Sequence, residues 1–189
     1  RSIAQDGAKC DGTTDDSAAI IATIANCMTN RCMVFIPPSP IGCVLASPLT
    51  INYASSQALT IAGVHSTASR LLCTMADDCI RLNTAVNIVL RDFLLVQSSP
   101  DAKWGINCVN SPNITVERMQ FSMVTTTRAF GEVGVLSFNL CYSSRVVSNT
   151  FGSINGNAIG IYAVNSSNAL YIAGNRIDGA LTYTGYGLH

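Results

Sequence analysis

One pattern limits the fold of this chain more than any other: a short segment ending in asparagine recurs at nearly constant spacing. Four six-residue segments can be aligned, and successive copies begin 27, 29 and 26 residues apart. They are residues 78–83, 105–110, 134–139 and 160–165. A second, more apolar segment recurs in step with the first and begins at Asn87, Asn113, Ser143 and Ala169. Because both segments keep their order in every copy, the chain is predicted to be a solenoid with one repeat per coil.

The repeat also predicts how the coils are stacked. Each coil of 26 to 29 residues would hold two or three short strands, and each strand would pair with its copies about 4.8 Å away. The asparagines that end the four segments are predicted to form an amide ladder along one corner, although four independent turn asparagines would fit the same pattern. They are Asn83, Asn110, Asn139 and Asn165. The alignment further predicts ion pairs between coils at Arg91–Glu117, Asp92–Arg118 and Lys103–Glu132.

The first fifty residues have a different pattern and are predicted to be a cap. Residues 6–20 read DGAKCDGTTDDSAAI, in which Thr14, Asp15 or Asp16 can cap a helix over about residues 15–27. A short strand at 33–36 is ended by two prolines, and a second strand follows near 47–51. The domain prediction is therefore a cap over 1–50 followed by coils over 51–189. The chain ends part way into the strand that would be a fifth copy, so we expect either more coils beyond it or a stacked subunit.

The cap sequence resembles the entry motif of the pectate-lyase-like superfamily. DGAKCDGTTDDSAAI is similar to GAKGDGxTDDTxAI, with Cys10 in place of a glycine, and VFIPPSPIGCVLASPLTI is similar to the strand–PPGTY–strand segment that follows that motif. The resemblance covers residues 6–51. It implies an all-β fold, a right-handed single-stranded parallel β-helix whose open first coil is sealed by an α-helix. Members include polygalacturonases, pectate lyases and phage tailspikes, but the cap lies away from the substrate cleft and implies no particular activity.

Composition limits the cellular locations and the binding partners that are expected for this chain. Apolar residues make up 48% of the chain, only 12% are charged, and the net charge is zero. Without a basic stripe, nucleic acid is not an expected partner, and without a long apolar run neither is a membrane. The eight cysteines form no C-x-x-C pair, so no metal site is predicted. They are either buried free thiols or disulfides. Disulfides would place the protein outside the cell or on a virion surface. The one pairing predicted is Cys27–Cys32, at the end of the helix.

Candidate catalytic residues are few. The run ADDCI at 76–80, followed by Arg81, resembles the DDC element of polygalacturonases, which implies Asp77 and Asp78 as general acid and water activator. The NTD, GHG and RIK motifs of that family are absent. A lyase would instead gather Asp77, Asp78 and Asp101 around calcium with Arg81 as base, and calcium is the one cofactor considered. Asn113-Ile114-Thr115 is a candidate glycosylation sequon, preferred to the one at Asn165.

These observations support two functions of different classes. The first is an extracellular β-helix, similar to tailspikes or pectinases, that binds or processes a polysaccharide along its exposed strand face. If it is an enzyme, it is a glycoside hydrolase or a polysaccharide lyase, but no complete catalytic motif is visible and we lean away from catalysis within this segment. The alternative is a non-enzymatic subunit of an extracellular filament or virion, which self-associates as a trimer or head to tail. Sparse charge and many cysteines favour this second function.

Overall fold

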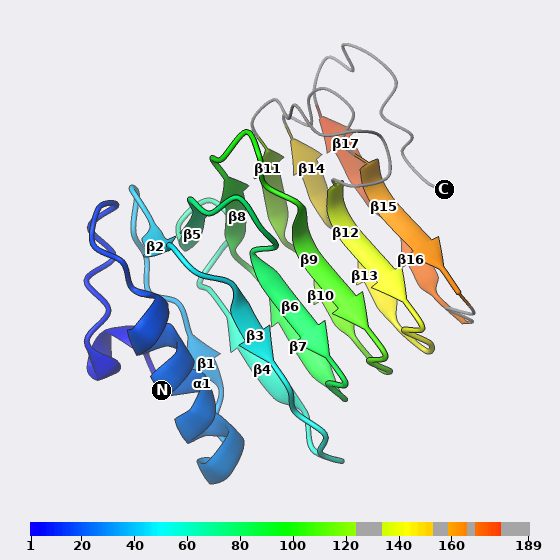
Figure 1. The fold of residues 1–189 in the computed structure, drawn as a ribbon, viewed down its shortest axis with the longest axis horizontal. Helices are drawn as coiled ribbons and strands as arrows, with labels where there is room; N and C mark the ends of the chain where they lie inside the picture. Colours follow the sequence, from blue (N-terminus) through cyan, green and yellow to red (C-terminus); the bar gives the residue numbers. More distant parts are fainter. Residues whose placement is uncertain (124–133, 153–158, 166–168, 179–189) are drawn as a thin grey trace.

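In the computed structural model the strands form three parallel sheets, and each coil contributes one strand to each sheet (Figure 1). The structure describes residues 1–123, 134–152, 159–165 and 169–178. The first sheet contains β1 (Val34–Phe35), β4 (Leu59–Ala62), β7 (Ile88–Arg91), β10 (Thr115–Glu117), β13 (Arg145–Val147) and β16 (Tyr171–Ala173). The second contains β2 (Cys43–Leu45), β5 (Arg70–Cys73), β8 (Leu94–Gln97), β11 (Gln120–Met123), β14 (Thr150–Gly152) and β17 (Arg176–Asp178). The third contains β3 (Leu49–Ile51), β6 (Ile80–Asn83), β9 (Trp104–Val109), β12 (Gly134–Asn139) and β15 (Ile159–Val164). The predicted parallel β-helix is confirmed.

Alternating side chains explain why these segments form strands. In β6, Ile80 and Leu82 point into the solenoid and are fully buried, while Arg81 between them is only half-buried. The same alternation recurs in each coil, so equivalent apolar side chains stack in columns inside the solenoid. Phe121 and Phe151, for example, are register partners whose ring centroids lie 5.3 Å apart. This stacked interior is the hydrophobic core of the protein.

The coils turn at residues with a left-handed backbone conformation, and these residues are themselves stacked. Two such positions lie between the third and first sheets, and one lies between the first and second. The first column is Thr84, Asn110, Leu140 and Asn165; the second is Asn87, Asn113, Ser143 and Ala169; the third is Asp92, Arg118, Ser148 and Gly174. A residue with positive φ bends the chain sharply, and asparagine tolerates this conformation better than most side chains. Many asparagines of the repeat are therefore explained by backbone geometry.

The register corrects the predicted asparagine ladder by one residue. Asn83 and Asn139 both pair with Val109 in β9, and Asn139 also pairs with Val164. Asn110 and Asn165 occupy the next position, where φ is positive. The four side chains thus alternate between two neighbouring positions instead of forming one column. Two of them are joined by a side-chain hydrogen bond, in which Asn165 Nδ2 donates to Asn139 Oδ1 at 3.0 Å.

A pair of side-chain amides, of which Asn149 is buried and Asn175 half-buried, lies instead at the corner between the first and second sheets, where no ladder was predicted. Asn149 is 1% exposed, and its Nδ2 donates to Val116 O at 2.9 Å and to Asn175 Oδ1 at 3.0 Å. Its Oδ1 accepts a 3.0 Å hydrogen bond from the backbone N–H of Met119. Asn175 Nδ2 repeats the pattern one coil later by donating to Val146 O at 2.8 Å. Each amide therefore satisfies backbone groups that the turn would leave unpaired inside the core.

The predicted ion pairs follow the register in part. Arg118 Nε lies 2.8 Å from Asp92 Oδ1, which confirms that pair. Arg91 and Glu117 are register partners as expected, but Arg91 forms its ion pair with Asp92, 3.3 Å away. Lys103 contacts Asp77, and its predicted partner at position 132 lies outside the described residues.

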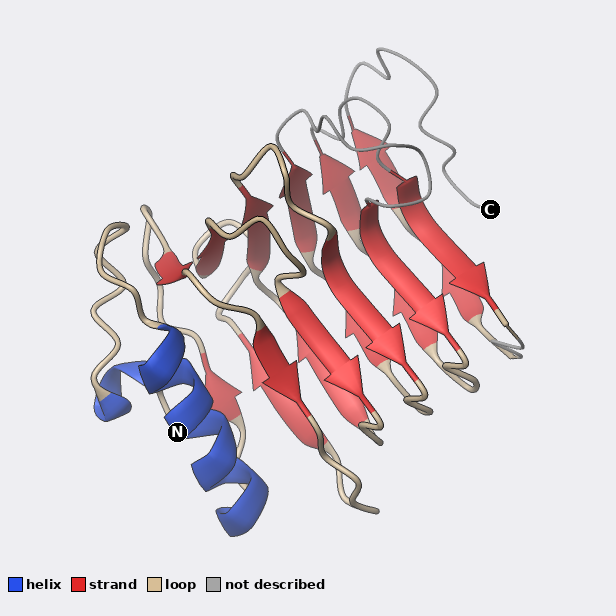
Figure 2. Ribbon diagram, in the orientation of Figure 1, coloured by secondary structure: helices blue, strands red, loops and turns tan. Residues whose placement is uncertain are grey.

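The helical cap packs on the first coil at the N-terminal end of the solenoid (Figure 2). A short 3-10 helix, η1 (Ile3–Asp6), precedes α1 (Ser17–Asn30), which buries Ile20 and Ile24 in the common core. Of the three proposed caps, Asp15 accepts the hydrogen bond of the Ser17 backbone N–H at 3.0 Å. The helix ends at Asn30, three residues later than predicted, and the next residue, Arg31, has a positive φ. It has 14 residues, and no described helix is long and apolar enough to cross a membrane.

Four disulfides join all eight cysteines. The predicted Cys27–Cys32 bond is present at the end of α1. The other three bonds are Cys10–Cys43, Cys73–Cys79 and Cys108–Cys141. The alternative of buried free thiols is therefore wrong. Such a complete set of disulfides fits an oxidising compartment.

Candidate functional site

The third sheet presents a row of polar side chains that runs across all five of its strands. Its register places one outward side chain per coil at the same height, so that the row follows the axis of the solenoid. We call these residues the polar row: Thr50, Arg81, Asn107, Ser137 and Tyr162. Four steps of about 4.8 Å give the row a length of about 19 Å. Two hydroxyls, a phenol, an amide and a guanidinium are thus lined up on one face.

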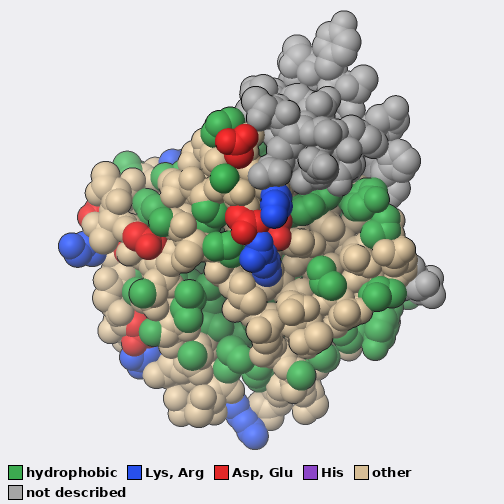
Figure 3. All heavy atoms as spheres, in the orientation of Figure 1, with side chains coloured by type: hydrophobic (Ala, Val, Ile, Leu, Met, Phe, Trp, Pro, Cys, Tyr) green, Lys and Arg blue, Asp and Glu red, His purple; other side chains and the backbone are tan. Residues whose placement is uncertain are grey.

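A charged cluster surrounds the second residue of the polar row. Arg81 Nη2 lies 2.5 Å from Asp77 Oδ1, and Arg81 Nε lies 2.9 Å from Asp78 Oδ2. Lys103, just before β9 in the next coil, places its Nζ 3.2 Å from Asp77 Oδ1. Figure 3 shows that charged side chains are few on this face and that several of them meet in one place. The structure thus brings the three predicted catalytic residues together and adds Lys103.

Asp78 holds two coils together. Its side chain is only 4% exposed, and Oδ1 accepts a 3.1 Å hydrogen bond from the Trp104 backbone N–H. Oδ2 accepts from Arg81 Nε and, at 3.0 Å, from Asn107 Nδ2. Both oxygens are therefore engaged with β6 and β9. Such a carboxylate positions Arg81 and Asn107 in the polar row.

The environment of Asp77 does not suit a general acid. Burial acts to raise the pKa of Asp77, but hydrogen bonds from Arg81, the Asp78 backbone N–H and Lys103 outweigh it and lower the pKa below the ordinary value. A general acid working near neutral pH needs a raised pKa. Hydrogen bonds to Asp78 and Asp77 raise the pKa of the Arg81 guanidinium, which disfavours its role as a base. Asp101 is exposed in the loop before β9.

Two aromatic side chains stack beside the end of the polar row that is formed by Tyr162. The rings of Trp104 and Tyr162 stack with their centroids 5.7 Å apart and an interplanar angle of 17°. Trp104 is in β9 and Tyr162 is in β15, so the stack bridges across β12, where Ser137 is 6% exposed. Because Trp104 itself is 7% exposed, its ring supports the row and does not form an open platform.

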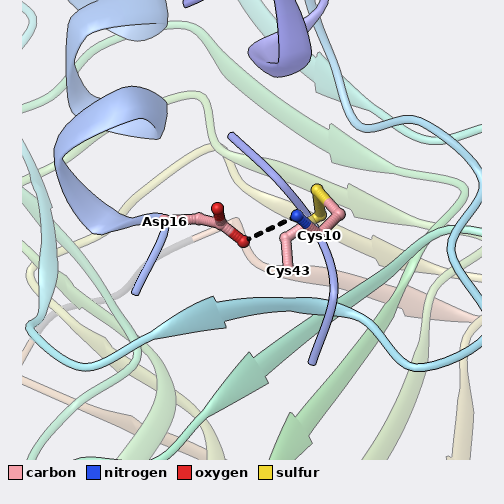
Figure 4. Close-up of side chains that lie close together, drawn as sticks. All are labelled: Cys10, Asp16 and Cys43. Atoms are coloured by element: carbon pink, nitrogen blue, oxygen red, sulfur yellow. Dashed lines mark hydrogen bonds between the residues drawn. A yellow bond between two sulfur atoms is a disulfide. The ribbon is translucent and has the colours of Figure 1, made fainter. Parts of the chain in front are cut away.

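The one other group of clustered ligand-type side chains in the described part of the chain lies in the cap. It consists of Cys10, Asp16 and Cys43 (Figure 4). The two sulfurs form a disulfide and offer no thiolate to a metal. Asp16 is 2% exposed and accepts backbone hydrogen bonds from Lys9 at 2.7 Å, Cys10 at 3.1 Å and Val44 at 3.2 Å. The group fastens the entry loop to β2 and does not fit a metal.

The predicted glycosylation site is on the surface. Asn113 is exposed and has a φ of 59° in the turn before β10. Thr115, the third residue of the sequon, is half-buried and begins that strand. The second sequon includes positions 166 and 167, which lie outside the described residues. Asn113 therefore stays the predicted acceptor.

Four members of the polar row were not predicted as site residues. Thr50, Asn107, Ser137 and Tyr162 belong to no recognisable motif, and each comes from a different coil. A signal was nevertheless present, because each lies between two apolar residues in its strand. Aligning the apolar residues of the repeat, and not its asparagines, would have placed these four side chains in register with Arg81.

No protein-family model and no curated protein matches this chain. Among solved structures, it is similar to the A-module of a mannuronan C-5 epimerase of Azotobacter vinelandii, with a TM-score of 0.69 and 18% identity over 99% of this chain and 57% of that one. It is also similar to the A-module of a second such epimerase, with a TM-score of 0.61 and 15% identity over 92% of this chain and 58% of that one. For ORF18 of Geobacillus virus E2 the TM-score is 0.55 and the identity 14%, over 92% and 40% of the two chains. The chain thus spans less than two thirds of each of these structures, with which it shares the fold of a parallel β-helix.

Proposed function

We propose that this chain binds an extended polysaccharide along the polar row of its third sheet. The observation that carries the proposal is the register of Thr50, Arg81, Asn107, Ser137 and Tyr162, which repeats hydrogen-bonding groups at one height in five successive coils. A polysaccharide also repeats its hydroxyl groups along its length, so one chain lying parallel to the solenoid axis can bond several rungs at once. The structural neighbours include epimerases named for a polysaccharide, mannuronan, which supports a polysaccharide as the ligand but does not decide its charge.

Binding without cleavage is the form of the proposal that the chemistry favours. Asp77 and Asp78 accept hydrogen bonds or ion pairs from five groups of the protein, and the pKa of Asp77 is lowered. A hydrolase needs one carboxyl group that is protonated near neutral pH, and the lowered pKa of Asp77 disfavours that role for Asp77. The same occupied oxygens disfavour a calcium site, so we expect binding to persist in EDTA. The disulfides favour a secreted or virion-surface location for this activity.

Binding is tested with the purified chain, a panel of polysaccharides and paired variants on two faces. Thr50→Ala and Tyr162→Phe each remove one hydroxyl from the polar row. Thr60→Ala and Tyr171→Phe remove the same groups from β4 and β16 of the first sheet and serve as matched controls. Because a hydrogen bond contributes about 0.5–1.5 kcal/mol, each row variant should weaken binding about twofold to tenfold. Equal effects on both faces, or the appearance of new reducing ends or unsaturated products, would contradict binding without cleavage along this row.

A second function, as a subunit of an extracellular filament or virion, is favoured by the last described coil. Ile177 is 46% exposed, although it is in register with Phe151, which is 2% exposed. Another subunit stacked on this coil would bury Ile177. Sedimentation velocity over a range of concentrations tests this function: Ile177→Asp should reduce association, and a monomer at every concentration argues against it.

A further inference from the structure

We propose that the polar row takes an uncharged glycan and discriminates against polymers of uronic acids. This inference rests on the proposed function and adds to it the class of substrate. Its starting point is the charged cluster of Asp77, Asp78, Arg81 and Lys103, which contains two carboxylates and two cations. The described residues of this cluster therefore carry no excess positive charge that an acidic polymer would need.

The two cations are already held by protein carboxylates. Arg81 contacts both aspartates, through Nη2 to Asp77 and through Nε to Asp78. Lys103 Nζ contacts the same Asp77 Oδ1 that Arg81 contacts. A uronate that approached either cation would have to displace Asp77 or sit beside it as a further carboxylate. Two carboxylates that share one site repel each other, and this disfavours the acidic ligand.

Hydroxyl groups meet no such penalty. A guanidinium has five N–H donors, and the contacts with Asp77 and Asp78 leave some of them for a neutral acceptor. The other members of the row that are not buried, Thr50, Asn107 and Tyr162, are uncharged and can donate as well as accept hydrogen bonds. The second outward row of the third sheet, Asn83, Val109, Asn139 and Val164, is uncharged too. A neutral, hydroxyl-rich chain therefore fits the described part of this face.

The substrate class is tested with polymers that differ only in charge. Polygalacturonate and polymannuronate are each compared with the polymer obtained by reducing their carboxylates to primary alcohols, and a panel of neutral glucans and mannans is added. Binding to the full chain is measured by affinity electrophoresis at low and at physiological salt. We expect the reduced polymers or members of the neutral panel to bind at least tenfold more tightly than the polyuronates.

Two variants test whether Asp77 provides the discrimination. Asp77→Asn keeps an oxygen acceptor for the Asp78 backbone N–H but removes one negative charge beside Arg81 and Lys103. It should raise the affinity for polyuronates at least threefold, most strongly at low salt. Asp92→Asn makes the same change in net charge at the corner between the first and second sheets, where Asp92 contacts Arg91 and Arg118. This control should leave the affinity for polyuronates unchanged.

The outcomes separate this inference from the proposed function. A wild-type chain that binds polyuronates as tightly as their reduced forms overturns the inference and leaves the proposed function standing. An equal gain in Asp77→Asn and Asp92→Asn also overturns it, since net charge alone would then explain the effect. If no polysaccharide of either class binds, the proposed function fails and the inference fails with it.

Discussion

Replacing Asn149 with leucine should destabilise the protein more than any comparable change at the asparagine-rich surface corner. Leucine has a similar size, so the substitution removes the amide without leaving a large cavity. Three side-chain hydrogen bonds are lost, to the Met119 N–H, Val116 O and Asn175 Oδ1. Because Asn149 is 1% exposed, water cannot easily replace the amide.

The expected magnitude follows from these three bonds. Stranding the buried Met119 N–H costs about 1–3 kcal/mol, and each of the two bonds donated by Asn149 Nδ2 contributes about 0.5–1.5 kcal/mol. The free energy of unfolding should therefore fall by about 2–6 kcal/mol. Asn139→Ala is the control, because it removes the hydrogen bond that Asn165 Nδ2 donates to Asn139 Oδ1 at the exposed corner. That change should cost less than about 1 kcal/mol.

Urea unfolding followed by circular dichroism, with the disulfides kept intact, measures both effects. The midpoint of the transition should fall while its slope stays the same, as expected when only the stability changes. A changed slope would instead indicate that the solenoid no longer unfolds as one cooperative unit. A midpoint for Asn149→Leu equal to that of the wild type would refute the argument that this amide satisfies buried backbone groups. An equal loss in Asn139→Ala would show that the exposed corner matters as much as the buried one.

Three further changes have expected outcomes in the same unfolding assay. Gln97→Met should stabilise the protein by about 1–3 kcal/mol, because Gln97 is 2% exposed and neither amide atom has a hydrogen-bond partner among the described residues; a lower midpoint would contradict this. Replacing Cys10 and Cys43 together by serine opens a loop with a sequence separation of 33 and should cost about 4 kcal/mol, and a loss below about 1 kcal/mol would count against the role of this disulfide. The hydrogen bond from Arg1 lowers the pKa of Asp6 to about 2 in the folded protein. The stability that ionised Asp6 contributes to the fold is therefore fully present above the unfolded pKa of about 3.9 and is lost as the pH falls toward 2. The urea midpoint should drop over this range in the wild type and less steeply in Asp6→Asn, and equal slopes would remove Asp6 as the cause.

The repeat in the sequence was sufficient to predict the fold but not its register. Asn83, Asn110, Asn139 and Asn165 share a residue type, yet Asn83 and Asn139 end their strands while Asn110 and Asn165 occupy the next position, where φ is positive. Asparagine is common in and beside turns, so it is a weak marker of register. The alternation of apolar residues is the stronger marker, because a slip of one residue would turn every core side chain outward.

The candidate site was predicted only where its residues are neighbours in the sequence. Asp77, Asp78 and Arg81 were recognised together, and the structure joins them by ion pairs. Lys103 and Asn107 complete the arrangement from the next coil, where no motif marked them. Their roles depend on which residue of β9 lies beside which residue of β6, and this could not be read from one segment alone.

The disulfides also differ in whether the sequence alone could predict them. Cys27–Cys32 was predictable because its half-cystines flank the end of one helix. Cys10–Cys43 and Cys108–Cys141 each join residues 33 apart, a separation longer than one coil. Eight cysteines allow 105 pairings, and only the stacking of coils shows which sulfurs meet.

The sequence by itself determined that this chain winds into a solenoid closed by a helix, because periodic burial of apolar side chains and a helix-capping segment are local properties of the chain. The tertiary structure alone decided which side chains of successive coils meet: the Asn149–Asn175 pair, the neutralised charges around Arg81 and the polar row. The physical reason is that strands pair through backbone hydrogen bonds, which are the same in every register. The register is selected by how all the core side chains pack together, a property of the whole stack of coils.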